Sequence, residues 1–494
     1  RSFWYVSATS APSRRAAFAM PNAIERLLMT PVTRIFLPVR NAMGRDYTVR
    51  LRSALISLLF PLLLAGCGDA WNDPYPAAER GKNILYTAFV NRPKHLDPVQ
   101  SYTSDEALFT RQVLEPPLQY HYLKRPYELE PLTAERIPEP VEIEGGKFTV
   151  YEVRIKPGIR YQPHPAFVPE NLSLPQSRIA SLTTPYELPL GTRELTAEDY
   201  AYQIKRLAHP RLHSVIFGLM AEYIVGLPEL ASSLKAADQD RSKWLDLREH
   251  RLEGVEVVDR YTYRVKLKGR YPQFKYWLAM PFFAPIPWEA ERFFHQPGMA
   301  PKNLTLDWWP VGTGAYMLAE NDPNARMVLE RNPNYRGQPY PSEGEPEDSA
   351  AGLLRDAGRT MPFIDKVVFS REKEAVPYWN KFLQGYYDSA GISSENFDQA
   401  VRTAVDGAAE PSGEMLDKGI TLSTSVAATI YYFGFNMKDP VVGGPGERAR
   451  KLRQARAVIT PQMFDALQNR QKFLRRMVQR RIQGIALRRH EYIQ

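Results

Sequence analysis

The sequence has very little cysteine and no hydrophobic run of membrane-spanning length. Cys67 is the only cysteine among 494 residues, so no disulfide can form within one chain. The main apolar run, residues 54–64, is much shorter than the roughly 20 residues that a membrane-spanning helix needs. This run therefore does not predict a lasting transmembrane helix.

Common signatures of catalysis and metal binding are also missing. The sequence contains neither a Gly-x-Ser-x-Gly elbow nor a His-Glu-x-x-His pattern. His209 and His213 have helical spacing, but Pro210 lies between them, which favours surface histidines. Gly312-x-Gly314 leads into a predicted strand instead of opening a helix, which argues against a phosphate loop. We therefore expect no enzyme, no cofactor and no metal site.

Positive charge is concentrated at the two ends of the chain. The chain has a net charge of +9, of which residues 1–66 carry +7 and residues 456–494 another +7. This leaves −5 for residues 67–455. A nucleic-acid-binding protein shows its basic surface on the folded domain. The mildly acidic body therefore predicts no nucleic-acid partner.

The region before Cys67 has the features of a secretory signal. Arg50 and Arg52 precede the apolar run 54–64, and small residues follow that run. The sequence Leu-Ala-Gly-Cys at 64–67 resembles the lipobox of bacterial lipoproteins, in which the cysteine is acylated. We expect lipid attachment at Cys67, with an ordinary buried cysteine as the alternative.

This signal defines the expected N-terminal organisation. Residues 1–42 begin with Arg1, and Met43 precedes the apolar run, so we expect translation to start at Met43 after a non-native upstream extension. Residues 43–66 are the expected signal peptide, and residues 67–82 a polar tether. The mature protein should be lipid-anchored to a bacterial membrane, in the periplasm or cell envelope.

Hydrophobic periodicity and the 42 prolines favour a mixed α/β chain. Strands are predicted at residues 84–90, 151–155, 255–257, 261–267, 315–319, 327–330, 366–370 and 429–436. Helices are predicted at residues 104–114, 197–208 and 376–384, and from residue 447. Long loops are expected at 157–194 and 339–358. Ser104 is the expected N-cap of the first helix, and Thr196 with Asp199 resembles a capping box for the second.

Eight short motifs share their order and spacing with one protein family. They begin at His95, Leu114, Leu129, Ile155, Leu195, Val311, Leu329 and Tyr431. Together they resemble the extracellular solute-binding proteins of family 5, bacterial lipoproteins that deliver oligopeptides to ABC transporters. The resemblance covers roughly residues 83–455.

The resemblance implies a two-lobed α/β fold of the periplasmic-binding-protein class II type, with an extra subdomain. The first lobe is expected at residues 83–340, with an inserted subdomain at about 105–190, and the second lobe begins within residues 360–455. The lobes would close on an oligopeptide by hinge motion. Expected partners are this peptide, the permease subunits of the transporter and the membrane, through the lipid anchor.

The resemblance also places candidate ligand residues. Counting along the motifs assigns the cleft-lining segment to Tyr102, Thr103 and Ser104, which would hold the peptide largely through main-chain groups. Ser104 as a simple helix cap is a compatible alternative. Tyr316 is a second ligand candidate, with ordinary core packing as its alternative.

The family pattern stops after residue 455. Residues 456–494 form an aberrant basic tail, which a shifted reading frame or a truncation would explain; the alternative is a basic amphipathic helix on anionic lipid. The family's acidic partner for the peptide amino terminus lies beyond this point, so the second lobe is incomplete. We therefore expect at best weak peptide binding, which micromolar affinity of residues 67–494 would contradict.

Two other classes of function stay open. An extracytoplasmic hydrolase would need two carboxylates that converge in a cleft as acid and base. A structural lipoprotein would use the basic tail to hold a membrane.

Overall fold

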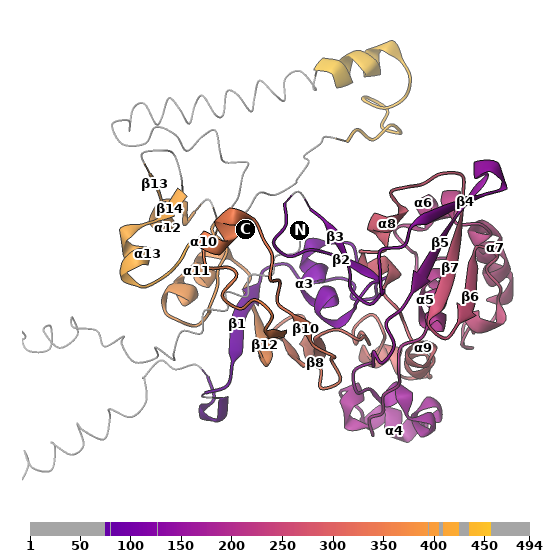
Figure 1. Ribbon diagram of the computed structural model, residues 1–494, viewed down its shortest axis with the longest axis horizontal. Coiled ribbons are helices and arrows are strands. Elements are labelled where there is room, and N and C mark those ends of the chain that lie inside the picture. The colour runs from indigo at the N-terminus through magenta and orange to yellow at the C-terminus, as the bar shows by residue number, and fades with distance from the viewer. Residues whose placement is uncertain are drawn as a thin grey trace, which may run out of the picture. The chain divides into compact units, whose positions relative to one another are not determined.

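The structure is a computed structural model that describes residues 75–79, 81–125, 127–393, 395–404, 409–423 and 434–455 (Figure 1). One compact unit includes residues 85–494 and contains the candidate site. The upstream extension, the signal peptide, Cys67, most of the tether and the basic tail lie outside the described residues. So does most of the strand predicted at 429–436.

A four-stranded sheet joins the start of this unit to segments far along the chain. Its order is β1 (Ile84–Phe89), β12 (Lys366–Arg371), β9 (Arg326–Arg331) and β8 (Tyr316–Asp322). Strands β8 and β9 form an antiparallel hairpin, and β12 pairs antiparallel with β9. All four strands were predicted, because each alternates or clusters apolar residues between turn residues.

A second four-stranded sheet is wholly antiparallel. Its order is β4 (Pro140–Ile143), β5 (Phe148–Arg154), β7 (Thr262–Lys268) and β6 (Val255–Asp259). Tyr151 and Val153 on β5 are buried on one face, as their alternation predicted. The sheet continues past the boundary predicted for the inserted subdomain at about residue 190, because β5 pairs with β7 across a long intervening segment.

Helices fill the sequence between and around the two sheets. They are α3 (Ser104–Val113), α5 (Ala197–Arg206), α6 (Phe217–Tyr223), α7 (Leu227–Ala237), α8 (Phe274–Trp277) and α9 (Trp288–Phe294). Helix α5 contacts β6 and β7, and Figure 1 shows it beside the second sheet. The predicted capping box at its start is present, because Asp199 accepts a hydrogen bond of 3.0 Å from the Thr196 N–H.

The segment 157–194 was expected to be a long loop and instead contains four short helices. They are α4 (Gln176–Ser181) and three 3₁₀ helices, Pro165–Phe167, Pro169–Ser173 and Pro185–Glu187. Each 3₁₀ helix begins with proline, whose fixed φ suits a first helical position. The segment also buries His164 completely among aromatic rings, and this burial lowers the pKa of its imidazole to about 3.

Shorter elements complete the described chain. The strands are β2 (Leu118–Tyr120), β3 (Leu129–Pro131), β10 (Gln338–Pro339), β11 (Thr360–Met361), β13 (Val401–Thr403) and β14 (Ala409–Pro411). The helices are α10 (Pro346–Ala350), α11 (Ala375–Leu383), α12 (Phe397–Ala400) and α13 (Gly413–Asp417). The remaining 3₁₀ helices are Ala77–Glu79, Glu144–Gly146, Leu247–Glu249, Pro281–Phe283 and Ala300–Lys302.

The C-terminal elements have a core of their own. Trp379 of α11 packs with Ala400, Val401 and Met415, which come from α12, β13 and α13. Helix α11 and the helical turns after residue 446 were both predicted from the sequence. Within the described residues, no helix combines the length and hydropathy needed to cross a membrane.

Candidate ligand-binding site

The predicted ligand segment lies at the protein surface, where the chain enters α3. Tyr102 is 73% exposed, and its ring stacks on Phe282 with the centroids 6.4 Å apart. Thr103 and Ser104 are also exposed. A ligand can therefore reach all three residues without displacing any core side chain.

A buried carboxylate holds this exposed segment in place. Glu106 is 2% exposed, and its Oε2 accepts hydrogen bonds from the N–H groups of Tyr102 at 2.8 Å and Thr103 at 3.0 Å. Its Oε1 accepts from the N–H groups of His95 at 3.1 Å and Lys94 at 3.3 Å. Burial alone would raise the pKa of Glu106, but these backbone hydrogen bonds lower it. The side chain is therefore a charged clamp between two turns of the loop.

The N-cap of α3 is Thr103, and the prediction of Ser104 was wrong. Thr103 has extended backbone angles, and its hydroxyl accepts from the Glu106 N–H at 3.4 Å. Thr103 and Glu106 together form a capping box, because glutamate stands three residues after the threonine. This spacing was the sequence signal that could have identified Glu106.

The clamp also limits how a peptide can pair with the segment. The N–H groups of Tyr102 and Thr103 already donate to Glu106, so they are not available to ligand carbonyls. Ser104 occupies the first position of α3, where the backbone N–H has no partner within the helix. Main-chain pairing at this segment would therefore use fewer amide donors than the family resemblance implies.

Replacing Glu106 by glutamine should loosen the segment. The new amide group would face two N–H donors with a donor of its own, and we expect the free energy of unfolding to fall by about 2–3 kcal/mol. Since the folded-state pKa is lowered from 4.5, the stabilisation by Glu106 is present above that value and is lost as pH falls through the lowered pKa. Urea unfolding at pH 7 and amide hydrogen exchange at Tyr102 measure the two effects.

Asp105→Asn provides the matched control. It removes the same charge from the same first helical turn, but among the described residues the Asp105 side chain makes just one 3.4 Å hydrogen bond, from the Asn91 side chain. We expect this control to lose less than about 1 kcal/mol. Equal losses for the two variants would show that Glu106 acts only through the helix dipole.

The loop before the segment is tied to the interior by a buried ion pair. Asp97 and Arg206 are 2% and 1% exposed, and the guanidinium makes hydrogen bonds of 2.6 and 3.1 Å to the two carboxylate oxygens. Glu291 accepts a third hydrogen bond from Arg206 at 3.1 Å. Burial would lower the pKa of Arg206, but the two carboxylates raise it. The motif at His95 therefore has a structural function, which is to anchor this loop to α5.

Gly312 and Gly314, whose spacing could suggest a phosphate loop, instead allow close backbone contact. A Cβ on Gly312 would lie 1.9 Å from the Val113 carbonyl oxygen, and the Gly314 N–H donates to that same oxygen at 2.9 Å. Between them, the Thr313 hydroxyl donates to the buried Glu115 at 2.9 Å, and Arg336 forms an ion pair with the same carboxylate. The glycines thus serve packing against the end of α3.

Tyr316 lies in β8 and is 6% exposed. Its hydroxyl donates to the Ile364 carbonyl at 2.9 Å. A buried ring with a hydrogen-bonded hydroxyl is the environment expected for ordinary core packing, which the sequence analysis gave as the alternative to ligand binding. A role of Tyr316 as a ligand residue stays a prediction.

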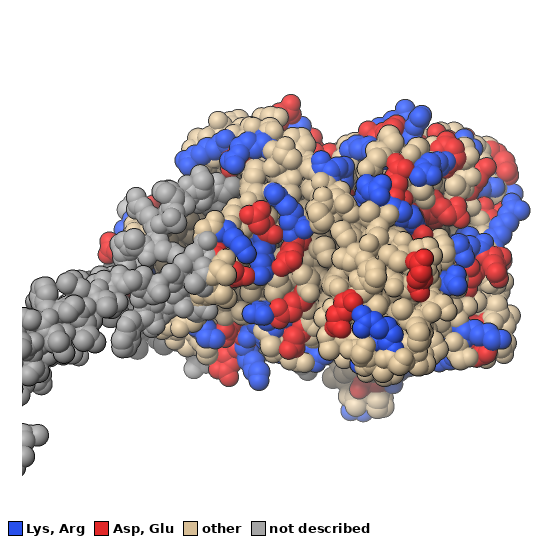
Figure 2. Space-filling view, turned by 90° about the horizontal axis from the view of Figure 1, so that it is seen from below, with Lys and Arg blue, Asp and Glu red and all other residues tan. Residues whose placement is uncertain are grey.

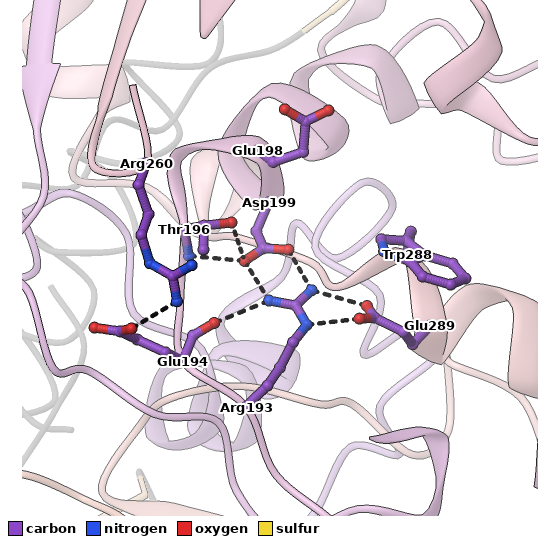
Figure 3. A pocket seen from close by; sticks show the side chains of 8 residues that line it. All are labelled: Arg193, Glu194, Thr196, Glu198, Asp199, Arg260, Trp288 and Glu289. Atoms are coloured by element: carbon purple, nitrogen blue, oxygen red, sulfur yellow. Dashed lines mark hydrogen bonds and ion pairs between the residues drawn. The ribbon is translucent and has the colours of Figure 1, made fainter. Parts of the chain in front are cut away.

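A small cavity of about 220 Å³ lies beside the start of α5 (Figure 3). Arg193 lies between two carboxylates there, with hydrogen bonds of 2.6 and 2.8 Å to Asp199 and of 2.6 and 2.8 Å to Glu289. Glu194 is paired with Arg260 at 2.7 Å. The central charges of this cavity are therefore engaged with one another, which favours a structural role.

The structure also locates the carboxylates that a hydrolase would need. Two pairs converge, Asp97 with Glu291 and Asp199 with Glu289, but each pair encloses an arginine. An acid and base pair that is neutralised in this way has no free proton donor to offer a substrate. Among the residues that the structure describes, no group of three or more His, Cys, Asp or Glu is placed to hold a metal ion.

Charged side chains are mixed over the surface. Figure 2 shows acidic and basic side chains interspersed on one face of the described chain. Many are paired at short range, such as Arg264 with Glu152 and Arg326 with Glu320. The charges on this face therefore form no extended patch of one sign.

Part of the chain is similar to known proteins. Residues 191–461, more than half of the chain, match the family "Bacterial extracellular solute-binding proteins, family 5 Middle". Over 142 residues the chain is 32% identical to the periplasmic oligopeptide-binding protein OppA of Salmonella typhimurium and 30% identical to that of Escherichia coli. Each alignment covers 28% of this chain and 23% of the relative.

Two solved structures are similar to part of the chain. Haemophilus influenzae OppA in complex with a peptide matches with a TM-score of 0.41 and 17% identity, over 65% of this chain and 48% of that one. Helicobacter pylori DppA in complex with a peptide matches with a TM-score of 0.40 and 16% identity, over 62% and 45%. The chain therefore spans less than half the length of the solved structures that it matches.

The family match begins after the segment Tyr102–Ser104 and Glu106, at residue 191. It includes Arg206, Glu291, Gly312 and Arg336, which hold the loop and the end of α3. The resemblance to family 5 that the short motifs indicated is confirmed, and the described residues form a mixed α/β chain. The chain belongs to the bacterial extracellular solute-binding proteins of family 5.

Proposed function

We propose that this chain captures oligopeptides outside the cytoplasm for import by an ABC transporter. The observation that carries the proposal is the exposed segment Tyr102–Ser104, which the buried Glu106 holds through two backbone hydrogen bonds. A preorganised surface segment lowers the entropy that ligand binding must overcome. In the family to which the chain belongs, such a segment would lie against the ligand.

The cellular setting is part of the same proposal. The lipobox at Cys67 would be acylated, which would hold the mature protein at a bacterial membrane. The permease subunits of the transporter would then receive the peptide from this anchored protein. The family is extracellular, which supports a position in the periplasm or cell envelope.

Calorimetric titration with short peptides tests the proposal. We expect the purified chain to bind a mixture of tri- to pentapeptides with affinity weaker than micromolar, and Tyr102→Ala to weaken this binding by about fivefold or more through lost stacking and contact area. Tyr102 is 73% exposed, so its truncation should leave folding intact. Equal thermal unfolding temperatures would verify this.

Val141→Ala is the control for a general loss of exposed apolar surface. Val141 is 58% exposed on β4 in the second sheet, away from α3 in the sequence. The control should bind peptides as the wild type does. Absence of any peptide binding up to about 10 mM would overturn the proposed function, since affinities in this range are already marginal.

A further inference from the structure

A buried histidine lies at the centre of an aromatic cluster where the segment 157–194 packs on α9. His164 is fully buried. The rings nearest to its imidazole are those of Phe294, Phe293, Tyr186 and Phe167, with centroids 5.4, 5.6, 6.0 and 6.5 Å away. Two 3₁₀ helices of the segment and α9 contribute these rings. The imidazole is therefore sealed from water as long as these elements stay together.

The two ring nitrogens of His164 leave no place for a second proton. Nδ1 accepts a hydrogen bond of 3.1 Å from the Ala166 N–H, which caps the 3₁₀ helix Pro165–Phe167. The single proton of the neutral ring is therefore on Nε2. Nε2 has no hydrogen-bond partner among the described residues. A second proton would have to bind Nδ1, where it would break the capping hydrogen bond.

The surroundings of His164 offer no compensating negative charge. The titratable groups on the elements around it are Tyr161, Tyr186, Arg193, Glu289 and His295. Arg193, whose guanidinium lies 5.6 Å from the Phe167 ring centroid, is itself a cation, and it engages Glu289 in an ion pair. Tyr186 accepts a hydrogen bond of 3.0 Å from the Gln162 side chain. Burial alone lowers the pKa of His164, and no carboxylate of the described chain forms an ion pair with it.

Backbone hydrogen bonds connect this cluster to the loop at Gly312. His164 and Gly191 pair through both of their backbone groups, at 2.9 and 3.1 Å. The Gln162 N–H donates to the Gly312 carbonyl at 2.9 Å, and the Gln162 side-chain oxygen accepts from the Gly312 N–H at 3.2 Å. Gly312 in turn packs against the end of α3. Opening of the segment 157–194 would therefore remove a support of the helix that follows Tyr102–Ser104.

We propose that the segment 157–194 is an acid-sensitive unit, which opens when His164 accepts a second proton. The proton would displace the Ala166 N–H and leave a charged ring among apolar ones, so the imidazolium would move into water. The segment would then separate from α9 and from Gly312. This conformational response needs no ligand and is independent of the proposed peptide capture. It would make the support of α3 depend on the pH of the compartment in which the protein works.

The pH range of the response follows from the two environments of the ring. The pKa of His164 is lowered to about 3 in the closed segment, whereas an exposed imidazole titrates near 6.5. Because the open form alone binds the proton between these values, its population should rise about tenfold for each pH unit below 6.5. Glu187 and Glu194 have pKa values lowered from 4.5 by hydrogen bonds, so they titrate below the range from pH 6.5 to 4.5.

A second buried histidine could produce an acid response in another part of the chain. His209, which follows α5, is 9% exposed, and burial lowers its pKa as well. Glu291 and Asp238 act in the opposite sense there, because their negative charges favour the protonated ring. A measurement that resolves the segment 157–194 from the rest of the chain is therefore needed.

Hydrogen–deuterium exchange of the full chain without ligand, followed by mass spectrometry at pH 6.5 and 4.5, tests the inference. Exchange rates are normalised to those of an unfolded peptide at each pH. We expect amide protection in the segment 157–194 to fall about hundredfold between the two pH values. The segment should also exchange faster than the ladder between β5 and β7, because it opens as a separate unit.

Two variants remove the titrating group in different ways. His164→Phe keeps an aromatic ring, and His164→Asn keeps a side-chain oxygen that can cap the 3₁₀ helix. In either variant the fall in protection should be less than about threefold. His213→Asn is the matched control, because His213 is exposed and its φ of 50° suits asparagine. This control should retain the hundredfold fall.

Three results would overturn the inference. A fall of less than about threefold in the wild type would show that the aromatic rings hold the imidazolium in place. An undiminished fall in a folded His164 variant would assign the response to another group. Equal exchange of the segment and the β5–β7 ladder at both pH values would show that the segment does not open on its own. The first and third results need only the wild type, so they apply even if both His164 variants fail to fold.

Discussion

Replacing Arg206 by methionine is expected to lower the free energy of unfolding by about 4 kcal/mol. Arg206 is 1% exposed and is the cation that neutralises Asp97 and Glu291. Methionine fills much of the volume but leaves Asp97, 2% exposed, without its cation in the interior. Urea unfolding at neutral pH, followed by far-UV circular dichroism, measures the loss.

Two further variants identify the cause of this loss. Asp97→Asn combined with Arg206→Met should be more stable than Arg206→Met alone, because the asparagine oxygen still accepts from the Val99 N–H and the unpaired charge at position 97 is removed. Arg260→Met breaks the more exposed pair with Glu194 and should cost less than about 1 kcal/mol. A loss below about 1 kcal/mol in Arg206→Met itself would contradict the prediction.

Replacing Gly312 by alanine should lower the free energy of unfolding by about 3 kcal/mol. The new Cβ would be 1.9 Å from the Val113 carbonyl oxygen, and that oxygen belongs to the backbone at the end of α3. The loop or the helix end must therefore move, which also disturbs the hydrogen bond from Thr313 to Glu115. Thermal and urea unfolding report the change.

Gly218→Ala is the matched control, because a Cβ on Gly218 has no atom within 4 Å outside its own neighbourhood in α6. Alanine is a better helix former than glycine, so this variant should be neutral or more stable by up to about 1 kcal/mol. If the two alanine variants unfold at the same urea concentration, the close approach at Gly312 does not constrain the fold.

Local patterns predicted local elements well. Helix α5 and the hairpin of β6 and β7 follow from a capping box and from strict alternation, and both depend on residues close together in the sequence. The extent of the second sheet could not be predicted in this way, because Glu152 and Arg264 pair across 112 residues. Nothing in either strand's own sequence identifies its partner.

In the candidate site, too, local features could be predicted from the sequence and long-range contacts could not. The segment Tyr102–Ser104 could be located by counting along motifs, but its clamp could not, because Glu106 also accepts hydrogen bonds from N–H groups eleven and twelve residues earlier in the chain.

The long-range pairing of β5 with β7 has a consequence for the order of folding. The hairpins of β4 with β5 and of β6 with β7 are local and can form within microseconds. The central β5–β7 ladder must wait until the more than one hundred residues between them have been released from the ribosome or translocon. Until then, each hairpin exposes an unpaired edge. The second sheet should therefore be the late, slow step of refolding and the part of the chain that most needs protection during export.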